Sequence, residues 1–177
     1  MQKRFAVVTL LLLTFAVFAN AQEKKKPLSP PATAQCKFSD GKSITVNYSS
    51  PRAKGRKIYG GLVPYGEVWR TGANDATALV TDTALTVDGK DVPAGSYTIF
   101  TVPNEDKWKL IVNKKTGEWG IPYKYESDEL GRVDMQVSKT SAPVENFTIS
   151  FHEMGNGCHM YLDWENTRAT VELSEKK

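Results

Sequence analysis

The stretch S-Y-T-I-F-T-V-P-N-E-D-K-W-K-L-I-V-N, residues 96–113, decides the fold class. Residues 96–102 are apolar on both faces of an extended chain, which is typical of a central strand with both faces covered. The sequence P-N-E-D that follows is a turn signal. Residues 107–113 then alternate, with Trp108, Leu110 and Val112 on one face. We therefore expect two neighbouring strands joined by a short turn.

Two further hairpins are expected on the N-terminal side of this stretch. A three-residue loop at residues 40–42 would place Cys36 opposite Val46 and keep the apolar side chains of both strands on one face. An Asp-Gly turn further along would pair Leu85 with Val92. Both registers bury one face, as an antiparallel sheet requires.

The alternation continues to the C-terminal end of the chain. A two-residue connection at residues 166–167 would pair Trp164 with Ala169. About ten short strands and no convincing helix predict an all-β, single-domain antiparallel β-sandwich of the jelly-roll kind over residues 34–175, with a β-barrel as the alternative. The four strands expected in this part are residues 132–138, 144–151, 159–165 and 168–173.

The first 33 residues are expected to lie outside this domain. Residues 1–21 have a basic start, an apolar run and the small-residue ending A-N-A, which predicts a cleaved signal peptide; an uncleaved anchor is the alternative. Residues 22–33 are charged and proline-rich, as in a flexible leader. We expect an exported protein, periplasmic or secreted, with no membrane span after cleavage.

The charge of the chain argues against nucleic acid as a partner. The formal net charge is +3, and residues 1–21 contribute two of the positive charges and no negative one. What remains is nearly neutral and lacks a basic stripe along the predicted strands. The sequence leaves the oligomeric state open.

The two cysteines, Cys36 and Cys158, are expected to form a disulfide. Both lie on core-facing sides of predicted strands, and an exported chain meets an oxidising compartment. A reactive role is the alternative, but there is no C-x-x-C motif, and the adjacent His159 would point to the opposite face of an extended strand.

Recognised catalytic and cofactor motifs are missing. The chain's two histidines, His152 and His159, do not form an H-x-x-x-H pair, so we expect no metal site. The sequence contains no nucleophile elbow, phosphate-binding loop or dinucleotide fingerprint, and we expect no cofactor. Whether the protein is an enzyme stays open at this point.

The densest group of special residues is the irregular stretch 59–77, Y-G-G-L-V-P-Y-G-E-V-W-R-T-G-A-N-D-A-T. In one interpretation Trp69 closes one end of the sandwich and Arg70 binds the protein's own carboxylates or carbonyls. In the other, Tyr65, Trp69, Arg70 and Asn74 line a cleft, where arginine would bind an anion and the aromatic rings would contact a ring or a sugar. A second irregular region, residues 114–130, carries further aromatic side chains.

Long motifs in this chain resemble a known family. The segment at residues 54–77, K-G-R-K-I-Y-G-G-L-V-P-Y-G-E-V-W-R-T-G-A-N-D-A-T, is similar to domain-of-unknown-function family 2911 of bacterial exported proteins. The similarity continues through D-V-P-A-G-S-Y-T-I-F-T-V-P, W-K-L-I-V-N-K and L-D-W-E-N-T-R, and covers about residues 30–173. The resemblance implies an exported single-domain protein and supplies no activity or site residue.

Three functions are compatible with these observations. The first is a cell-envelope binding module for a small anionic or sugar ligand near residues 65–74. The second is a hydrolase that acts on envelope glycans through a pair of carboxylates. The third is a structural or protein-interaction domain, which would expose an apolar patch instead of a concave site.

Overall fold

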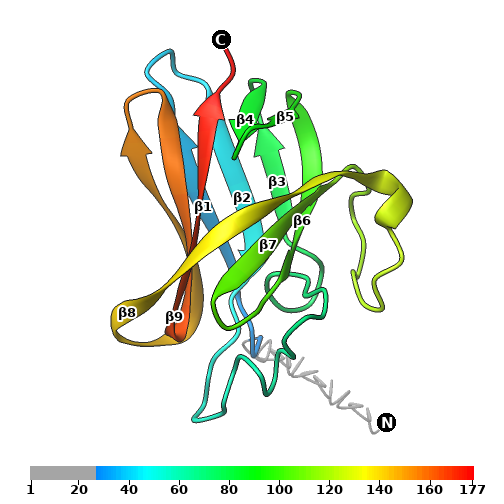
Figure 1. Ribbon diagram of the computed structural model, residues 1–177, viewed down its shortest axis with the longest axis vertical. Coiled ribbons are helices and arrows are strands. Elements are labelled where there is room, and N and C mark those ends of the chain that lie inside the picture. Colours follow the sequence, from blue (N-terminus) through cyan, green and yellow to red (C-terminus); the bar gives the residue numbers. More distant parts are fainter. Residues whose placement is uncertain (1–26) are drawn as a thin grey trace, which may run out of the picture.

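The computed structural model describes residues 27–177, and Figure 1 shows their arrangement. The expected signal peptide and the first part of the expected leader lie outside the described residues. The described chain is all-β, with one short 3₁₀ helix, η1 (Glu126–Asp128). The strands are β1 (Pro31–Lys37), β2 (Ser43–Ser49), β3 (Ala78–Thr81), β4 (Leu85–Val87), β5 (Lys90–Val92), β6 (Gly95–Val102), β7 (Lys107–Asn113), β8 (Glu129–Met154) and β9 (Gly157–Glu175).

All nine strands belong to one antiparallel sheet in the order β1-β2-β3-β6-β7-β8-β9-β4-β5. The sheet curls so that β1 comes close to the far end of β8, where the Lys37 N–H donates to Glu153 Oε1 at 3.4 Å. β1 and β5 remain unpaired edges, so the sheet does not close into a barrel. The all-β antiparallel prediction is confirmed.

The central strand β6 is apolar on both faces, and β7 adds one apolar residue to the outer face, because each face has its own cover. The inner face contributes Ile99, Trp108 and Leu110 to the main core. The outer face carries Phe100 and Ile111, which pack under aromatic side chains of the irregular region that follows β7. The prediction from residues 96–113 of two neighbouring strands is confirmed.

β8 and β9 replace the four short strands expected at the C-terminal end. They form one long hairpin with register shifts between Lys139 and Thr148. The hairpin bends so sharply that the two ends of β9 come together: the Glu175 N–H donates to the C=O of Asn156, just before the strand begins, at 3.0 Å. The predicted pairing of Trp164 with Ala169 is wrong. Both lie in the single strand β9, whose first half pairs with the second half of β8 and whose later residues pair with the first half of β8, where Ala169 lies opposite Val137.

The other hairpin registers are partly as expected. Leu85 pairs with Val92, as predicted from the Asp-Gly turn. In the first hairpin Cys36 lies opposite Ile44, not Val46, because the three-residue loop occupies residues 39–41. The predicted register is wrong by two residues, which leaves every side chain on its predicted face. Strand β1 begins at Pro31, so the expected flexible leader is also wrong for residues 31–33.

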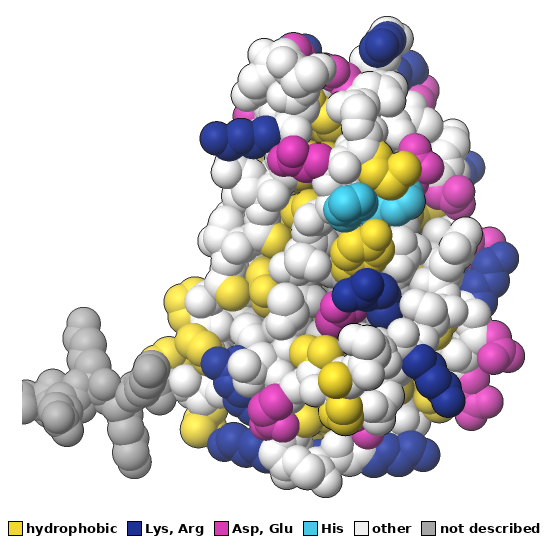
Figure 2. All heavy atoms as spheres, turned by 90° about the vertical axis from the view of Figure 1, so that its left-hand side faces the viewer, with side chains coloured by type: hydrophobic (Ala, Val, Ile, Leu, Met, Phe, Trp, Pro, Cys, Tyr) yellow, Lys and Arg dark blue, Asp and Glu magenta, His cyan; other side chains and the backbone are white. Residues whose placement is uncertain are grey.

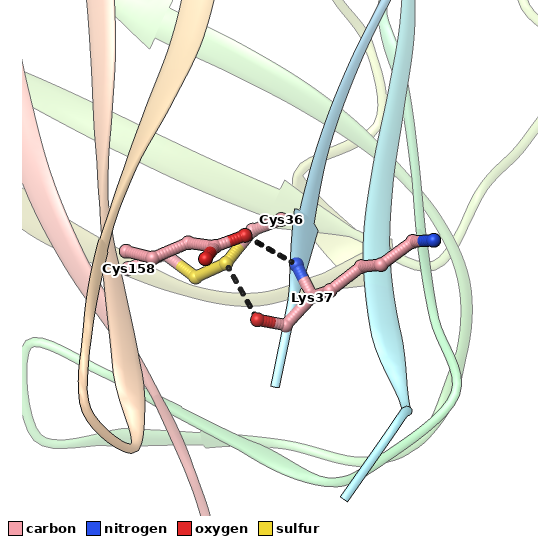
Figure 3. The surroundings of a disulfide bond; sticks show 4 residues. Cys36, Lys37 and Cys158 are labelled. Atoms are coloured by element: carbon pink, nitrogen blue, oxygen red, sulfur yellow. Dashed lines mark hydrogen bonds between the residues drawn. A yellow bond between two sulfur atoms is a disulfide. The ribbon is translucent and has the colours of Figure 1, made fainter. Parts of the chain in front are cut away.

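The disulfide between Cys36 and Cys158 joins β1 to the start of β9, as Figure 3 shows. The two Cα atoms are 6.6 Å apart and both side chains are fully buried. The bond confirms the predicted pairing. It fastens the tip of the long hairpin to the first strand and so holds the curled sheet together.

Candidate functional site

The long connection between β2 and β3 lies at the end of the sheet from which the N-terminal segment leaves (Figure 1). One half of it follows β6, where Trp69 and Thr101 exchange two backbone hydrogen bonds of 2.7 and 2.9 Å. The other half follows β8 through a bridge between Arg52 and Asn146. The connection is therefore fixed to two strands that are not neighbours in the sheet.

Trp69 belongs to the core, as the first of the two interpretations expects. Its side chain is only 7% exposed, and its indole N–H donates to the Gly72 C=O at 3.1 Å. The ring stacks on Trp164 with centroids 5.9 Å apart and planes 17° from parallel. Other buried aromatic side chains meet it edge-on: Tyr59, Trp108 and Phe147.

A cleft of about 360 Å³ opens above this pair of tryptophans. Trp69, Arg70 and Asn74 all line it, so the structure brings three of the four predicted residues together. Tyr65 does not line it: its ring lies against Gly60, where a Cβ would come within 2.7 Å of the tyrosine. The remaining lining residues that matter for its chemistry are Ser29, Arg56, Leu62, Glu67, Ile121 and Trp164.

Arg70 is half-buried in the wall of the cleft and is held by carbonyl groups. One terminal nitrogen donates to the Asn74 C=O and, at 3.2 Å, to the Trp119 C=O. The guanidinium lies 4.6 Å from the centre of the Trp119 ring, in a cation–π contact. Within residues 27–177 no carboxylate comes within ion-pairing distance of this guanidinium. Burial lowers the pKa of Arg70, and nearby Asp75 partly offsets this effect.

Asn74 has a structural task as well as a place in the lining. Its backbone adopts the left-handed conformation, with φ of 58°. Its side-chain amide donates to the Ser29 C=O and to Ser49 Oγ, both at 3.2 Å. Asn74 therefore holds the segment that precedes β1 against the rim of the cleft.

Arg56 is a second guanidinium in the lining, and we did not predict it. Its Nε donates to the Ala53 C=O at 3.0 Å and one terminal nitrogen donates to the Arg52 C=O at 2.6 Å. Like Arg70, it forms no ion pair with a carboxylate of the described chain. Glu67 is the one carboxylate residue that the structure places in the lining.

Exposed apolar side chains surround the mouth of the cleft. Leu62 and Ile121 line it directly, and Trp119 covers Arg70. Leu28 projects beside it, next to Ser29. Figure 2 shows hydrophobic and basic side chains together at the end of the molecule from which the N-terminal trace leaves. This end therefore combines unpaired cationic groups with an apolar rim.

Only indirect signals in the sequence point to Arg56, Ile121 and Trp119, which we did not predict for this cleft. Ile121 and Trp119 come from the second irregular region, and Gly120 between them lets that segment approach the connection closely. A Cβ on Gly120 would lie 2.9 Å from the Ala76 Cβ and 3.3 Å from the Arg70 Cβ. Arg56 precedes the quoted stretch 59–77, and only the tertiary structure turns it back toward the cleft.

The described residues offer neither a metal cluster nor a membrane-spanning helix. Residues 27–177 contain no cluster of three or more histidine, cysteine, aspartate or glutamate side chains arranged to hold a metal ion. They also contain no helix with the length and apolar character needed to cross a membrane.

Comparisons with known proteins give the family and nothing more specific. Neither a curated protein nor a solved structure matches the chain. One family model matches residues 29–173, which includes every strand except the last two residues of β9 and all the residues of the cleft discussed above. The chain therefore belongs to the family described as "Protein of unknown function (DUF2911)".

Proposed function

We propose that the protein is a binding module whose cleft takes a small organic anion with an apolar part. The observation that carries this proposal is the pair of guanidinium groups, Arg56 and Arg70, in one cleft without a carboxylate partner in residues 27–177. Arg70 is half-buried and has only neutral partners, so a bound anion would supply the counter-charge that it lacks, and the exposed Arg56 adds a second positive charge at the same cleft.

The carbonyl contacts leave room for such a ligand on Arg70. The two hydrogen bonds to carbonyl groups use one terminal nitrogen, and the rest of the guanidinium offers further N–H donors. Carboxylates and phosphates accept from two of these donors at once. Trp119 and the Asn74 carbonyl hold the guanidinium in place, which reduces the side-chain entropy lost on binding.

The lining suggests which anion fits. Leu62, Ile121 and the edges of the two tryptophans offer apolar surface beside the arginines. The volume of about 360 Å³ is within the range of small-molecule sites. A sugar receives less support, because Trp69 and Trp164 are buried against each other and do not present open faces.

The two alternatives draw little support from this cleft. A carboxylate-pair hydrolase needs two acidic groups, and among the described residues Glu67 alone supplies one here. A purely structural or protein-interaction domain would not need a concave site with unpaired cations, although the apolar rim is compatible with one. The buried disulfide is compatible with the proposal that the protein works outside the cytoplasm.

Thermal unfolding with paired ligands tests the proposal. We expect 4-phenylbutyrate to raise the melting temperature of the purified protein and its neutral amide, 4-phenylbutyramide, to have little effect. A ligand at 100 times its Kd adds about 2.7 kcal/mol of stability, which corresponds to several degrees for a domain of this size. Inorganic phosphate and glucose complete the panel. Phosphate tests whether negative charge alone is enough for binding, and glucose tests whether the cleft binds a sugar.

Variants identify the site. Arg70→Gln removes the charge and keeps an amide that can donate to a carbonyl, so we expect a folded protein without the response. Arg52→Gln is the matched control, because Arg52 donates to the Ser50 C=O and does not line the cleft. The proposal fails if no member of the panel stabilises the wild type, or if Arg70→Gln responds as strongly as the wild type.

A further inference from the structure

His152 and His159 lie directly opposite each other in the hairpin of β8 and β9. Six residues separate them in the sequence. The hairpin turn at residues 155–156 sets this register and pairs Met154 with Gly157. Opposite residues of antiparallel strands point to the same face, with Cβ atoms about 4.5–5.5 Å apart. Figure 2 shows the histidine side chains side by side on the outer surface of the molecule.

We propose that this cross-strand pair binds a borderline divalent transition metal, of the class of Cu²⁺, Ni²⁺ and Zn²⁺. Imidazole nitrogen suits these three ions, whereas Mg²⁺ and Ca²⁺ prefer oxygen ligands. Two imidazoles at this spacing can bind one ion together, and the short hairpin that carries them orders both ligands before the ion arrives. No third protein ligand is in reach within residues 27–177, which leaves positions open for water or an exchanging ligand.

The surroundings of the pair favour a cation. His159 lies at the margin of a broad outer groove of about 690 Å³, which is lined by the carboxylate residues Asp88, Asp106, Asp134 and Glu172. Lys107 and Lys109 both pair with Asp134, which leaves one surplus positive charge at that point. In the described chain, the other three carboxylates form no ion pair. These three negative charges outnumber the surplus positive charge, so the potential in the groove attracts an approaching cation.

A second neighbour of the His159 ring, on β9 itself, is also compatible with a bound cation. Tyr161, the next outward-facing residue of β9, meets it edge-on with ring centroids 6.3 Å apart. Arg168 lies over that tyrosine ring, 4.4 Å from its centre, and its charge is neutralised by Asp163, which accepts two hydrogen bonds from it. This guanidinium therefore does not oppose a bound cation with an unbalanced charge.

The purpose of this site is distinct from that of the arginine cleft. The pair lies on the hairpin whose tip is held by the Cys36–Cys158 disulfide, and neither histidine lines the cleft. A bound ion would cross-link β8 to β9 near this tip, and its open positions would let it take a further ligand from solution or from another molecule.

Calorimetry on the purified, untagged protein tests the proposal with each metal chloride alone. We expect one ion per chain, with Cu²⁺ bound more tightly than Ni²⁺ or Zn²⁺, and no comparable heat from Mg²⁺ or Ca²⁺. His152→Gln and His159→Gln should each weaken binding at least about tenfold, equivalent to about 1.4 kcal/mol. Since the chain has two histidines in all, the double variant removes every imidazole.

A variant that keeps both histidines but breaks their cross-strand pairing, the register variant, tests whether binding needs this geometry. The exchange His152→Glu/Glu153→His keeps both histidines and the net charge but moves one imidazole out of register, so binding should fall to the level of the single variants. Glu172→Gln should weaken binding only slightly. Electron paramagnetic resonance of the Cu²⁺ complex should show two equatorial imidazole nitrogens.

Several outcomes would overturn the site. Equal affinity in the wild type and either single variant would mean that the pair is not the ligand. Equal binding of Mg²⁺ and Ni²⁺ would assign the effect to the acidic groove alone, and full binding by the register variant would exclude the cross-strand geometry. Circular dichroism checks that each variant is folded, which is expected because His152 is exposed and His159 half-buried.

Discussion

Trp69 and Trp164 form an offset stack, with ring centroids 5.9 Å apart, although one lies in the connection after β2 and the other at the bend of β9. The pair joins the most irregular part of the chain to the most distorted strand. It also forms the base of the cleft. The position of Arg70 therefore depends on a core contact made by the residue just before it.

Replacing either tryptophan by alanine should make the protein less stable. Trp69→Ala and Trp164→Ala should each lower the free energy of unfolding by about 3–5 kcal/mol, the usual cost of a large cavity in a core. Trp119→Ala is the matched control, because Trp119 is 55% exposed and its loss should cost about 0.5 kcal/mol or less. Urea titration measures all three, and similar values for Trp69→Ala and Trp119→Ala would contradict the assignment of Trp69 to the core.

Two buried tyrosines should respond in opposite directions to loss of the hydroxyl group. The Tyr59 hydroxyl has no hydrogen-bond partner among the described residues, so Tyr59→Phe should leave stability unchanged or raise it by about 1 kcal/mol. The Tyr48 hydroxyl accepts from the Ile149 N–H at 3.0 Å, and Tyr48→Phe should cost about 1–2 kcal/mol. Chemical denaturation of both variants decides the point. A clear loss in Tyr59→Phe would mean that this hydroxyl is bonded in solution.

Loss of the disulfide should weaken the fold without changing its topology. The bond closes a loop across a sequence separation of 122, and its removal should cost about 2–4 kcal/mol. Cys36→Ala and Cys158→Ala should lose nearly the same amount as the double variant, since any one of them breaks the bond. Additive losses would contradict this. Two free thiols in the unfolded, unreduced wild type would show that the bond is absent.

Acid should destabilise the protein partly through Glu129. Hydrogen bonds from Arg132 hold the pKa of this carboxylate below its ordinary value of 4.5, with a further contribution from the Tyr123 hydroxyl. A pKa that is lower in the folded state stabilises the fold above the unfolded value, and this contribution is lost as the pH falls through the folded value. Glu129→Gln should cost about 1 kcal/mol at neutral pH, an amount limited because Arg132 is partly exposed.

Comparing how the stability of the wild type and of Glu129→Gln depends on pH tests whether Glu129 is responsible. The wild type should lose more stability than Glu129→Gln between about pH 6 and pH 3, because only the wild type has this carboxylate to protonate. Parallel stability curves for the two proteins would remove Glu129 from the explanation.

The sequence predicts those parts of the fold that depend on residues close together in the chain, such as tight turns. An Asp-Gly turn has few geometries, so the pairing of Leu85 with Val92 followed directly. The bend of β9 did not follow, because alternation looks the same in two paired strands and in one strand that folds back. Glu165 at this bend has φ of 53°, which a sequence pattern does not predict for a non-glycine residue.

The candidate site was predictable only where its residues are neighbours in the chain. Arg70 and Asn74 were grouped because they lie close together in one irregular stretch, and they do share the cleft. Tyr65 was grouped for the same reason, but Gly60 offers its ring a place away from the cleft. Arg56 and Ile121 reach the cleft through tertiary packing, and no local pattern relates them to Arg70.

The hydrogen bond from Asn74 to Ser29 has a practical consequence for handling the protein. Because Ser29 lines the cleft, a tag, reporter or bead coupled at residues 27–29 would lie at the mouth of the proposed binding site. The C-terminus leaves from the opposite end of the sheet, beyond β9 (Figure 1). Immobilisation through the C-terminal lysines would therefore keep the cleft facing solvent, and a sensor surface prepared in the other orientation would obstruct its own analyte.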